Sequence, residues 1–102
     1  MIVYSVFIKL DKKYESEWTN FMTEKHIGDV MNTGCFIGYE FLKEIESDET
    51  VNFRVDYYLT SQDKMNEYLT NHSPILRQDV TAKFGGKFTA ERCIYSKIKS
   101  FI

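Results

Sequence analysis

The sequence predicts an α+β fold whose elements follow one another in the order β, α, β, β, α, β. Residues 2–9 and 50–60 are rich in β-branched and aromatic side chains, which is typical of strands. Residues 11–31 and 61–84 carry apolar side chains at roughly helical spacing. An acidic turn at 46–49 indicates that two strands form an antiparallel hairpin.

The first strand is expected at residues 2–9, and both of its faces carry apolar side chains. Asp11 can cap the helix that follows, because its carboxylate can accept hydrogen bonds from free backbone N–H groups. This helix is expected to weaken near Gly28 and to end at Asn32-Thr33-Gly34, since glycine readily adopts a left-handed backbone. Its apolar side chains are Tyr14, Trp18, Phe21, Met22 and Met31.

Residues 35–45 and 50–60 are expected to form the hairpin around the turn. Because alternate residues of a strand face opposite sides, the second of these strands presents one apolar and one polar face. The apolar face, which is expected to meet the helices, consists of Val51, Phe53, Val55, Tyr57 and Leu59. The other face consists of Asn52, Arg54, Asp56 and Tyr58.

A second helical region is expected between residues 61 and 84. Ser61 can cap its first part, and Pro74 can begin a second part because proline suits a first helical turn. Gly85-Gly86 ends this region, and residues 87–98 form the last strand. The expected buried side carries Met65, Tyr68, Leu69, Ile75, Leu76, Val80 and Phe84. This order predicts a ferredoxin-like fold, a four-stranded antiparallel sheet with helices on one face.

The composition indicates one globular domain over residues 1–102, with 43% hydrophobic and 27% charged residues. A net charge of -2 without a basic stripe argues against nucleic acid as a partner. No apolar run approaches the roughly 18 residues that indicate a membrane span. No basic region precedes residues 2–8 as it would in an export signal. We therefore expect a cytoplasmic protein in which Cys35 and Cys93 are reduced thiols.

The first strand is central in this topology, so one of its apolar faces must point away from the helices. That face carries either Val3 and Phe7 or the set Ile2, Tyr4, Val6 and Ile8, and Phe36 and Leu42 are expected to add to it. Exposing about 400 Å² of such surface would cost about 10 kcal/mol, which rivals a whole domain's stability of about 5–15 kcal/mol. We therefore expect a homodimer through the open sheet face. The alternative is that residues 97–102 fold over it.

Four segments give the sequence a specific resemblance: His26-Ile27-Gly28-Asp29-Val30, Thr33-Gly34-Cys35-Phe36, His72-Ser73-Pro74-Ile75-Leu76 and Phe84-Gly85-Gly86-Lys87-Phe88. Together they resemble a bacterial family of unknown function over nearly the whole chain. That family is similar to dimeric α+β barrel proteins, in which two ferredoxin-like sheets pack face to face. Relatives of this barrel type include cofactor-free monooxygenases, isomerases of ring compounds and haem-degrading enzymes, so the resemblance implies a fold and no particular activity. Members often carry proline where this chain has Gly28, which implies a less rigid helix end here.

Two histidines are candidates for chemistry. His26 can cap the end of the first helix, or it can form with Asp29 an oriented base, because a carboxylate partner fixes the tautomer needed for proton abstraction. His72 can satisfy loop backbone groups or serve as an axial haem ligand. The spacing of the histidines and cysteines lacks the short paired separations of zinc sites. We therefore predict no metal site and no cofactor.

Arg54 and Asp56 share one face of an expected inner strand, where buried charges need partners. One interpretation is a structural ion pair that Glu40 or Arg92 extends across the dimer axis. The other is a polar pocket. In that pocket Arg54 holds an anionic ligand, Asp56 or Glu40 moves a proton, and Tyr58 donates a hydrogen bond.

Two functions remain open at this stage. A structural or regulatory dimer without chemistry is favoured by the absence of a compact catalytic motif. A small-molecule-binding protein or cofactor-free enzyme, of monooxygenase or isomerase type, is favoured by the resemblance and by the polar groups on the covered face. The size of any cavity distinguishes the two, because a drug-sized site usually needs about 300 Å³ or more.

Overall fold

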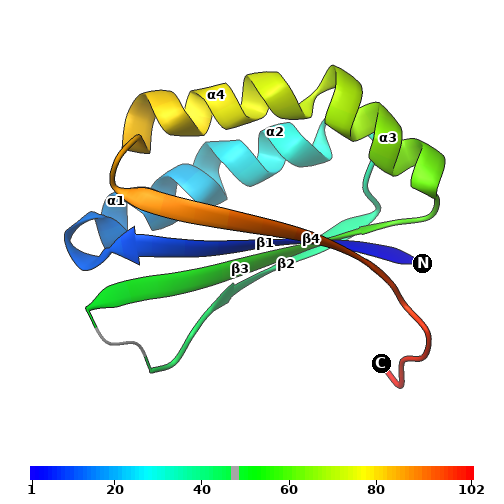
Figure 1. The fold of residues 1–102 in the computed structure, drawn as a ribbon, viewed down its shortest axis with the longest axis horizontal. Coiled ribbons are helices and arrows are strands. Elements are labelled where there is room, and N and C mark those ends of the chain that lie inside the picture. The colour runs from blue at the N-terminus through cyan, green and yellow to red at the C-terminus, as the bar shows by residue number, and fades with distance from the viewer. Residues whose placement is uncertain (47–48) are drawn as a thin grey trace.

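The structure is a computed structural model that describes residues 1–46 and 49–102, so Ser47 and Asp48 of the predicted acidic turn lie outside the described residues. Four antiparallel strands lie in the order β2, β3, β1, β4, and the helices cover one face of the sheet (Figure 1). The ferredoxin-like prediction is confirmed. The strands are β1 (Ile2–Asp11), β2 (Gly38–Lys43), β3 (Thr50–Leu59) and β4 (Phe88–Ser96). The helices are α1 (Glu15–Phe21), α2 (Ile27–Met31), α3 (Gln62–Asn71) and α4 (Ser73–Phe84).

Strand β1 lies between β3 and β4 and pairs with both along its length, with Ile2 opposite Leu59 and Ser96. Tyr4 and Ile8 of this strand are buried in the core against the helices. The other phase of β1, which faces the open side of the sheet, consists of Val3, Ser5, Phe7 and Lys9. The structure thus settles which of the two apolar phases meets the helices.

Local hydrogen bonds and one turn glycine fix the ends of the helical regions at the predicted residues. Asp11 Oδ1 accepts a hydrogen bond of 3.1 Å from Lys13 N at the start of the first helical region. Ser61 Oγ accepts one of 3.2 Å from Lys64 N at the start of α3. Gly34, with φ of +77°, turns the chain after α2.

The first helical region changes its hydrogen-bonding pattern before Gly28, and α2 then continues through that glycine. A 3₁₀ turn (Lys12–Tyr14) precedes α1, and a π-helical segment (Met22–His26) joins α1 to α2. The π-helical segment has wider turns than an α-helix. Such segments are rare in proteins, and those that occur are often found at functional sites. His26 is the last residue of this one. Among the described residues, no helix is both long enough and apolar enough to cross a membrane.

Two predicted positions are wrong. Phe36 was expected on the open face, but β2 begins only at Gly38, and Phe36 packs instead on the helix side with its ring centroid 4.8 Å from that of Tyr68. Ile75 was expected on the buried side of α4, but it is 65% exposed. The inward side of that helix carries Val80 instead. Phe36 therefore adds to the core and not to a dimer surface.

The open face of the sheet keeps an apolar surface. Val3 and Phe7 are half-buried there, and Leu42 and Tyr95 are each 44% exposed. The C-terminal residues do not cover this face, because Ile98, Phe101 and Ile102 are almost fully exposed and the chain end lies away from the strands (Figure 1). The alternative of a cover by residues 97–102 is therefore wrong.

Candidate functional site

Polar side chains at the middle of the open face form a closed network. Ser5 and Asp56 are buried in the single chain. Ser5 Oγ donates a hydrogen bond of 2.6 Å to Asp56 Oδ1, and Arg54 Nε donates one of 2.8 Å to the same oxygen. The bond to Asp56 raises the pKa of Arg54. The structural ion pair is present, and the pocket interpretation of these residues stays a prediction.

The other candidates on this face also have partners. Tyr58 Oη donates a hydrogen bond to Glu40, and this bond raises the pKa of Tyr58 to about 12. Arg54 lies with its guanidinium carbon 5.0 Å from the centroid of the Phe7 ring. Asp56, Glu40 and Tyr58 are occupied by these pairs, whereas Arg54 bonds only through Nε and keeps its other guanidinium N–H groups without a partner among the described residues.

A groove of about 450 Å³ runs along one end of the open face. Phe7, Leu42 and Arg54 are among the residues that line it. Its volume reaches the size of a small-molecule site, but it lies on the face that we expect a second chain to cover. A partner sheet would either enclose this groove or fill it.

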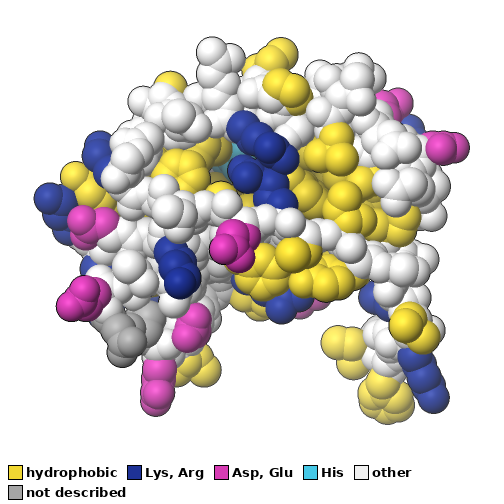
Figure 2. Space-filling view, in the orientation of Figure 1, with side chains coloured by type: hydrophobic (Ala, Val, Ile, Leu, Met, Phe, Trp, Pro, Cys, Tyr) yellow, Lys and Arg dark blue, Asp and Glu magenta, His cyan; other side chains and the backbone are white. Residues whose placement is uncertain are grey.

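A second hollow lies on the other side of the sheet, between the strands and the helices. It measures about 50 Å³, which is room for a few water molecules or one small polar group. Figure 2 shows this side of the molecule, where basic and hydrophobic side chains surround a hollow between α4 and β4 and a histidine is visible at depth. Aromatic and aliphatic side chains make most of its wall, and its polar residues include His26, Ser73, Arg77 and Arg92.

Two buried polar atoms of this cavity wall have no hydrogen-bond partner among the described residues: Trp18 Nε1 and Ser73 Oγ. Leaving a buried donor or acceptor unpaired costs about 1–3 kcal/mol, so native proteins rarely do so without a bound water or ligand. The cavity therefore offers hydrogen bonds that the fold itself does not use.

Arg77 of α4 and Arg92 of β4 both line this cavity. Arg77 donates only a long hydrogen bond of 3.4 Å, to Tyr4 Oη. No carboxylate of the described residues lies within 4.0 Å of either guanidinium. Arg92 pairs opposite Val6 and so faces the helices, which separates it from Arg54 by the thickness of the sheet. Two unpaired guanidiniums at one opening favour the binding of an anion.

His26 reaches the same cavity from the π-helical segment. Its ring stacks on Phe21 at a centroid distance of 5.7 Å. Burial lowers the pKa of His26, and the charge of Asp29 opposes this effect only in part. Asp29 accepts its hydrogen bond from Lys25 Nζ at 2.7 Å, so the structure does not pair it with His26. The predicted base is thus a neutral imidazole whose surroundings are mainly apolar.

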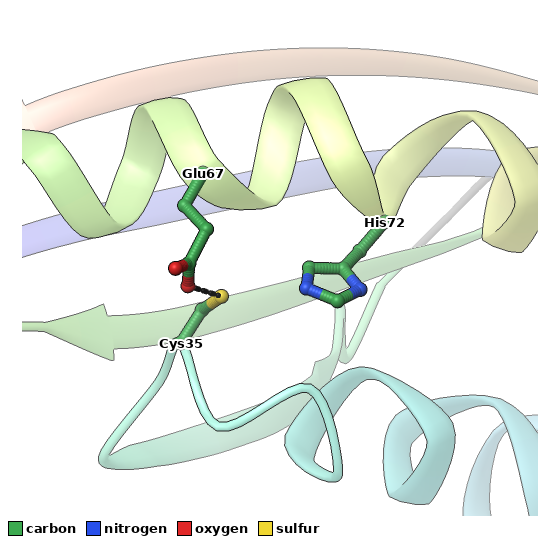
Figure 3. Close-up of side chains that lie close together, drawn as sticks. All are labelled: Cys35, Glu67 and His72. Carbon is green, nitrogen blue, oxygen red and sulfur yellow. Dashed lines mark hydrogen bonds between the residues drawn. The ribbon is translucent and has the colours of Figure 1, made fainter.

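The structure brings together three residues that the sequence analysis did not connect. Cys35, Glu67 and His72 meet beside α3, with their ligand atoms within 4.8 Å of one another (Figure 3). Cys93 does not share in this group, because it pairs opposite Ser5 on the open face of the sheet.

Sequence reasoning missed Trp18, Ser73 and Arg77 as parts of a site, because nothing in a sequence marks a buried polar atom that lacks a partner. For Arg92 a signal was present. It falls on the same strand phase as the apolar residues Phe88 and Ala90, and this phase faces the helices.

Several solved structures share the fold of this chain. MhuD, a haem degrader from Mycobacterium tuberculosis with two haems bound in its active site, matches with a TM-score of 0.73 at 14% identity, over 99% of each chain. SnoaB, a cofactor-independent oxygenase from Streptomyces nogalater, matches with 0.69 at 12% identity, over 97% of this chain and 94% of that chain. A dimeric ferredoxin-like protein from an uncultured marine organism matches with a TM-score of 0.67 at 14% identity, over 100% of this chain and 99% of that chain. These identities show the fold alone, which is ferredoxin-like.

Residues 1–98 match the family described as a domain of unknown function, DUF4286, and the chain belongs to this family. The predicted membership of a family of unknown function is thereby confirmed. No curated protein matches the chain. Its function therefore has to be argued from the geometry above.

Proposed function

We propose that this protein binds a small molecule with an anionic head group in the cavity between the sheet and the helices. One observation carries the proposal. Arg77 and Arg92 lack carboxylate partners among the described residues, and they border the same cavity as the unpaired atoms of Trp18 and Ser73. The two arginines are exposed to solvent, whereas Trp18 Nε1 and Ser73 Oγ are buried, and a fold that buried these two atoms only for stability would pair them.

The shape of the site limits the ligand. The cavity measures about 50 Å³, far less than a drug-sized ligand needs, so only the head group fits inside. The body of the ligand lies in the mouth between α4 and β4, against hydrophobic side chains (Figure 2). A carboxylate on a flat apolar or aromatic body meets both conditions, since guanidinium groups bind carboxylates with two parallel hydrogen bonds.

His26 gives the site a base. Because burial holds its pKa below the ordinary value of about 6.5, the imidazole is neutral at pH 7 and can accept a proton from a bound ligand. Proton removal from an activated carbon is the step that a cofactor-free oxygenase or isomerase needs from its protein. The fold shared with SnoaB, described as a cofactor-independent oxygenase, supports this form of the proposal.

A thermal-shift screen tests the binding step. Aromatic and aliphatic monocarboxylates are screened, each beside its neutral amide, with haem as a separate probe. We expect some carboxylates to raise the melting temperature, their amides to have little effect, and Arg92→Gln to abolish the rise. Arg54→Gln is the matched control on the opposite face and should keep it. Equal shifts for acids and amides, or a rise that survives Arg92→Gln, would contradict the proposal.

The same proposal includes a homodimer through the open sheet face. The support is the apolar surface of Val3, Phe7, Leu42 and Tyr95, together with a structural neighbour described as dimeric. The free thiols of Cys35 and Cys93 support a reducing compartment such as the cytoplasm. Sedimentation equilibrium should give twice the chain mass of 12.1 kDa. A structural dimer without a ligand is the remaining alternative, and it gives this mass with no hit in the screen.

A further inference from the structure

The side chains of Cys35, Glu67 and His72 converge from two separate parts of the chain. Cys35 lies in the loop after α2, whereas Glu67 comes from α3 and His72 from the junction between α3 and α4 (Figure 3). Cys35 Sγ lies 3.0 Å from Glu67 Oε2, and one ligand atom of each residue lies within 4.8 Å of the other two. The three side chains point toward one another (Figure 3).

The loop holds Cys35 in place through its own hydrogen bonds. Thr33 Oγ1 donates a bond of 2.7 Å to Val30 O and accepts one of 3.3 Å from Cys35 N. Gly34, with its positive φ, makes the turn that directs the cysteine toward α3. Cys35 is buried, with 3% of its surface exposed.

The break between α3 and α4 brings His72 to the same side as Glu67. Five positions along an ideal helix would turn the two side chains well apart. His72, with φ of -122°, has left the geometry of α3 and swings its ring back toward the cysteine. His72 also lines a shallow groove of about 290 Å³, together with Thr33 and Ile75 among others.

We propose that Cys35, Glu67 and His72 bind one zinc ion, a site that neither the family description nor the cavity proposal includes. Sulfur, imidazole nitrogen and carboxylate oxygen are the donor types that Zn²⁺ prefers. In a tetrahedral zinc site, neighbouring donor atoms lie about 3.5 Å apart, so small side-chain rotations convert the observed separations of at most 4.8 Å into a site. Three protein ligands leave the fourth position to water.

A cysteine nucleophile explains this group less well. Burial, followed by the hydrogen bond to Glu67, raises the pKa of the Cys35 thiol, whereas a nucleophile needs a lowered one.

Lys64 Nζ, at 3.5 Å from Glu67 Oε2, would compete with a metal for that carboxylate. The titratable and charged groups around the sulfur are thus Glu67, Lys64, His72 and Tyr68. A metal must displace the thiol proton, so its affinity should rise with pH.

The test uses the whole protein, stripped of metal with a chelator, and Zn²⁺ or Co²⁺ alone as the probe. Competition with a chromophoric chelator should give one Zn²⁺ per chain. Co²⁺ should produce a sulfur-to-cobalt charge-transfer band and visible bands of tetrahedral type. We expect Cys35→Ser to remove the charge-transfer band, and His72→Gln or Glu67→Gln to weaken Zn²⁺ binding at least 10-fold. The second pair of variants matters because both positions lie nearer the surface than Cys35 and disturb the fold less.

Two matched controls distinguish this site from general metal binding. Cys93→Ser changes the other free thiol, on the open face, and His26→Gln changes the other histidine, so both should keep the wild-type affinity. Lys64→Gln should keep or tighten binding because it removes the competitor for Glu67. Wild-type protein without stoichiometric Zn²⁺, a charge-transfer band that survives Cys35→Ser, or loss of binding in Cys93→Ser would each overturn the proposal.

Discussion

The two faces of the sheet hold their buried polar groups in opposite ways. On the open face, Asp56 accepts hydrogen bonds from both Ser5 and Arg54. On the helix face, Ser73 Oγ and Trp18 Nε1 are equally buried but have no partner among the described residues. A paired group stabilises the fold, whereas an unpaired one is available to a ligand. From this comparison we propose that the ligand site is the cavity and that the charged residues of β3 have a structural role.

The largest expected effect comes from Asp56→Ala. It removes the acceptor shared by Ser5 and Arg54 and leaves a buried hydroxyl and a half-exposed guanidinium unpaired. We expect a loss of about 3 kcal/mol in the free energy of unfolding, measured by urea denaturation. Glu40→Gln on the exposed strand β2 is the control and should cost under about 1 kcal/mol. Similar losses for both would contradict a structural role for Asp56.

The next effect concerns the cover of the open face. Phe7→Asp places a charge on the apolar surface of β1, and we expect it to raise the dimer dissociation constant at least 100-fold, or about 2.7 kcal/mol. Ile75→Asp, at an exposed position on the helix side, should leave the dimer intact. Sedimentation equilibrium measures both. An unchanged dimer in Phe7→Asp would mean that another surface joins the two chains.

A matched pair of serines tests the comparison itself. Ser5 and Ser73 are 0% and 2% exposed, but only Ser5 has a hydrogen-bond partner among the described residues. We expect Ser5→Ala to cost about 1–2 kcal/mol and Ser73→Ala to be neutral or slightly stabilising in ligand-free protein. A cost for Ser73→Ala as large as that for Ser5→Ala would show that water already pairs Ser73, which would weaken the case for a ligand there.

The smallest effect is a pH dependence. Burial lowers the pKa of His26 in the folded state, so below the unfolded value of about 6.5 the unfolded chain binds a proton that the folded chain does not. Stability is therefore expected to fall as pH drops through 6.5, by less than about 1.4 kcal/mol per pH unit from this group. Urea denaturation at pH 7.5 and 5.5 should show a smaller difference in His26→Gln. An equal difference in both proteins would assign the pH dependence to other groups.

Much of the fold follows from local patterns in the sequence. The capping residues Asp11 and Ser61 and the turn glycine Gly34 act as predicted because their effects depend only on neighbouring backbone. The face of β3 that meets the helices was also predictable from its strict alternation. Phe36 was misplaced because the start of a strand depends on its partner's register, which a single segment does not reveal.

The candidate sites were less predictable because each joins residues that are distant in sequence. Cys35 and His72 were rejected as metal ligands on their spacing alone, yet the loop after α2 and the α3–α4 junction bring them together. His26 and Arg92 were both named, but the cavity that they share depends on the packing of β4 against the helices. A pattern can identify a chemically able residue, and only the tertiary structure supplies its partners.

The central claim is that ligand binding belongs to the cavity between the sheet and the helices and not to the open face. Amide and side-chain NMR shifts test it most directly, recorded while the carboxylate with the largest melting shift is titrated into labelled protein. We predict saturable shifts at Ser73, Arg77 and Arg92, with little change at Ser5 and Arg54. Saturable shifts centred on Ser5 and Arg54, or none for any carboxylate, would contradict the claim.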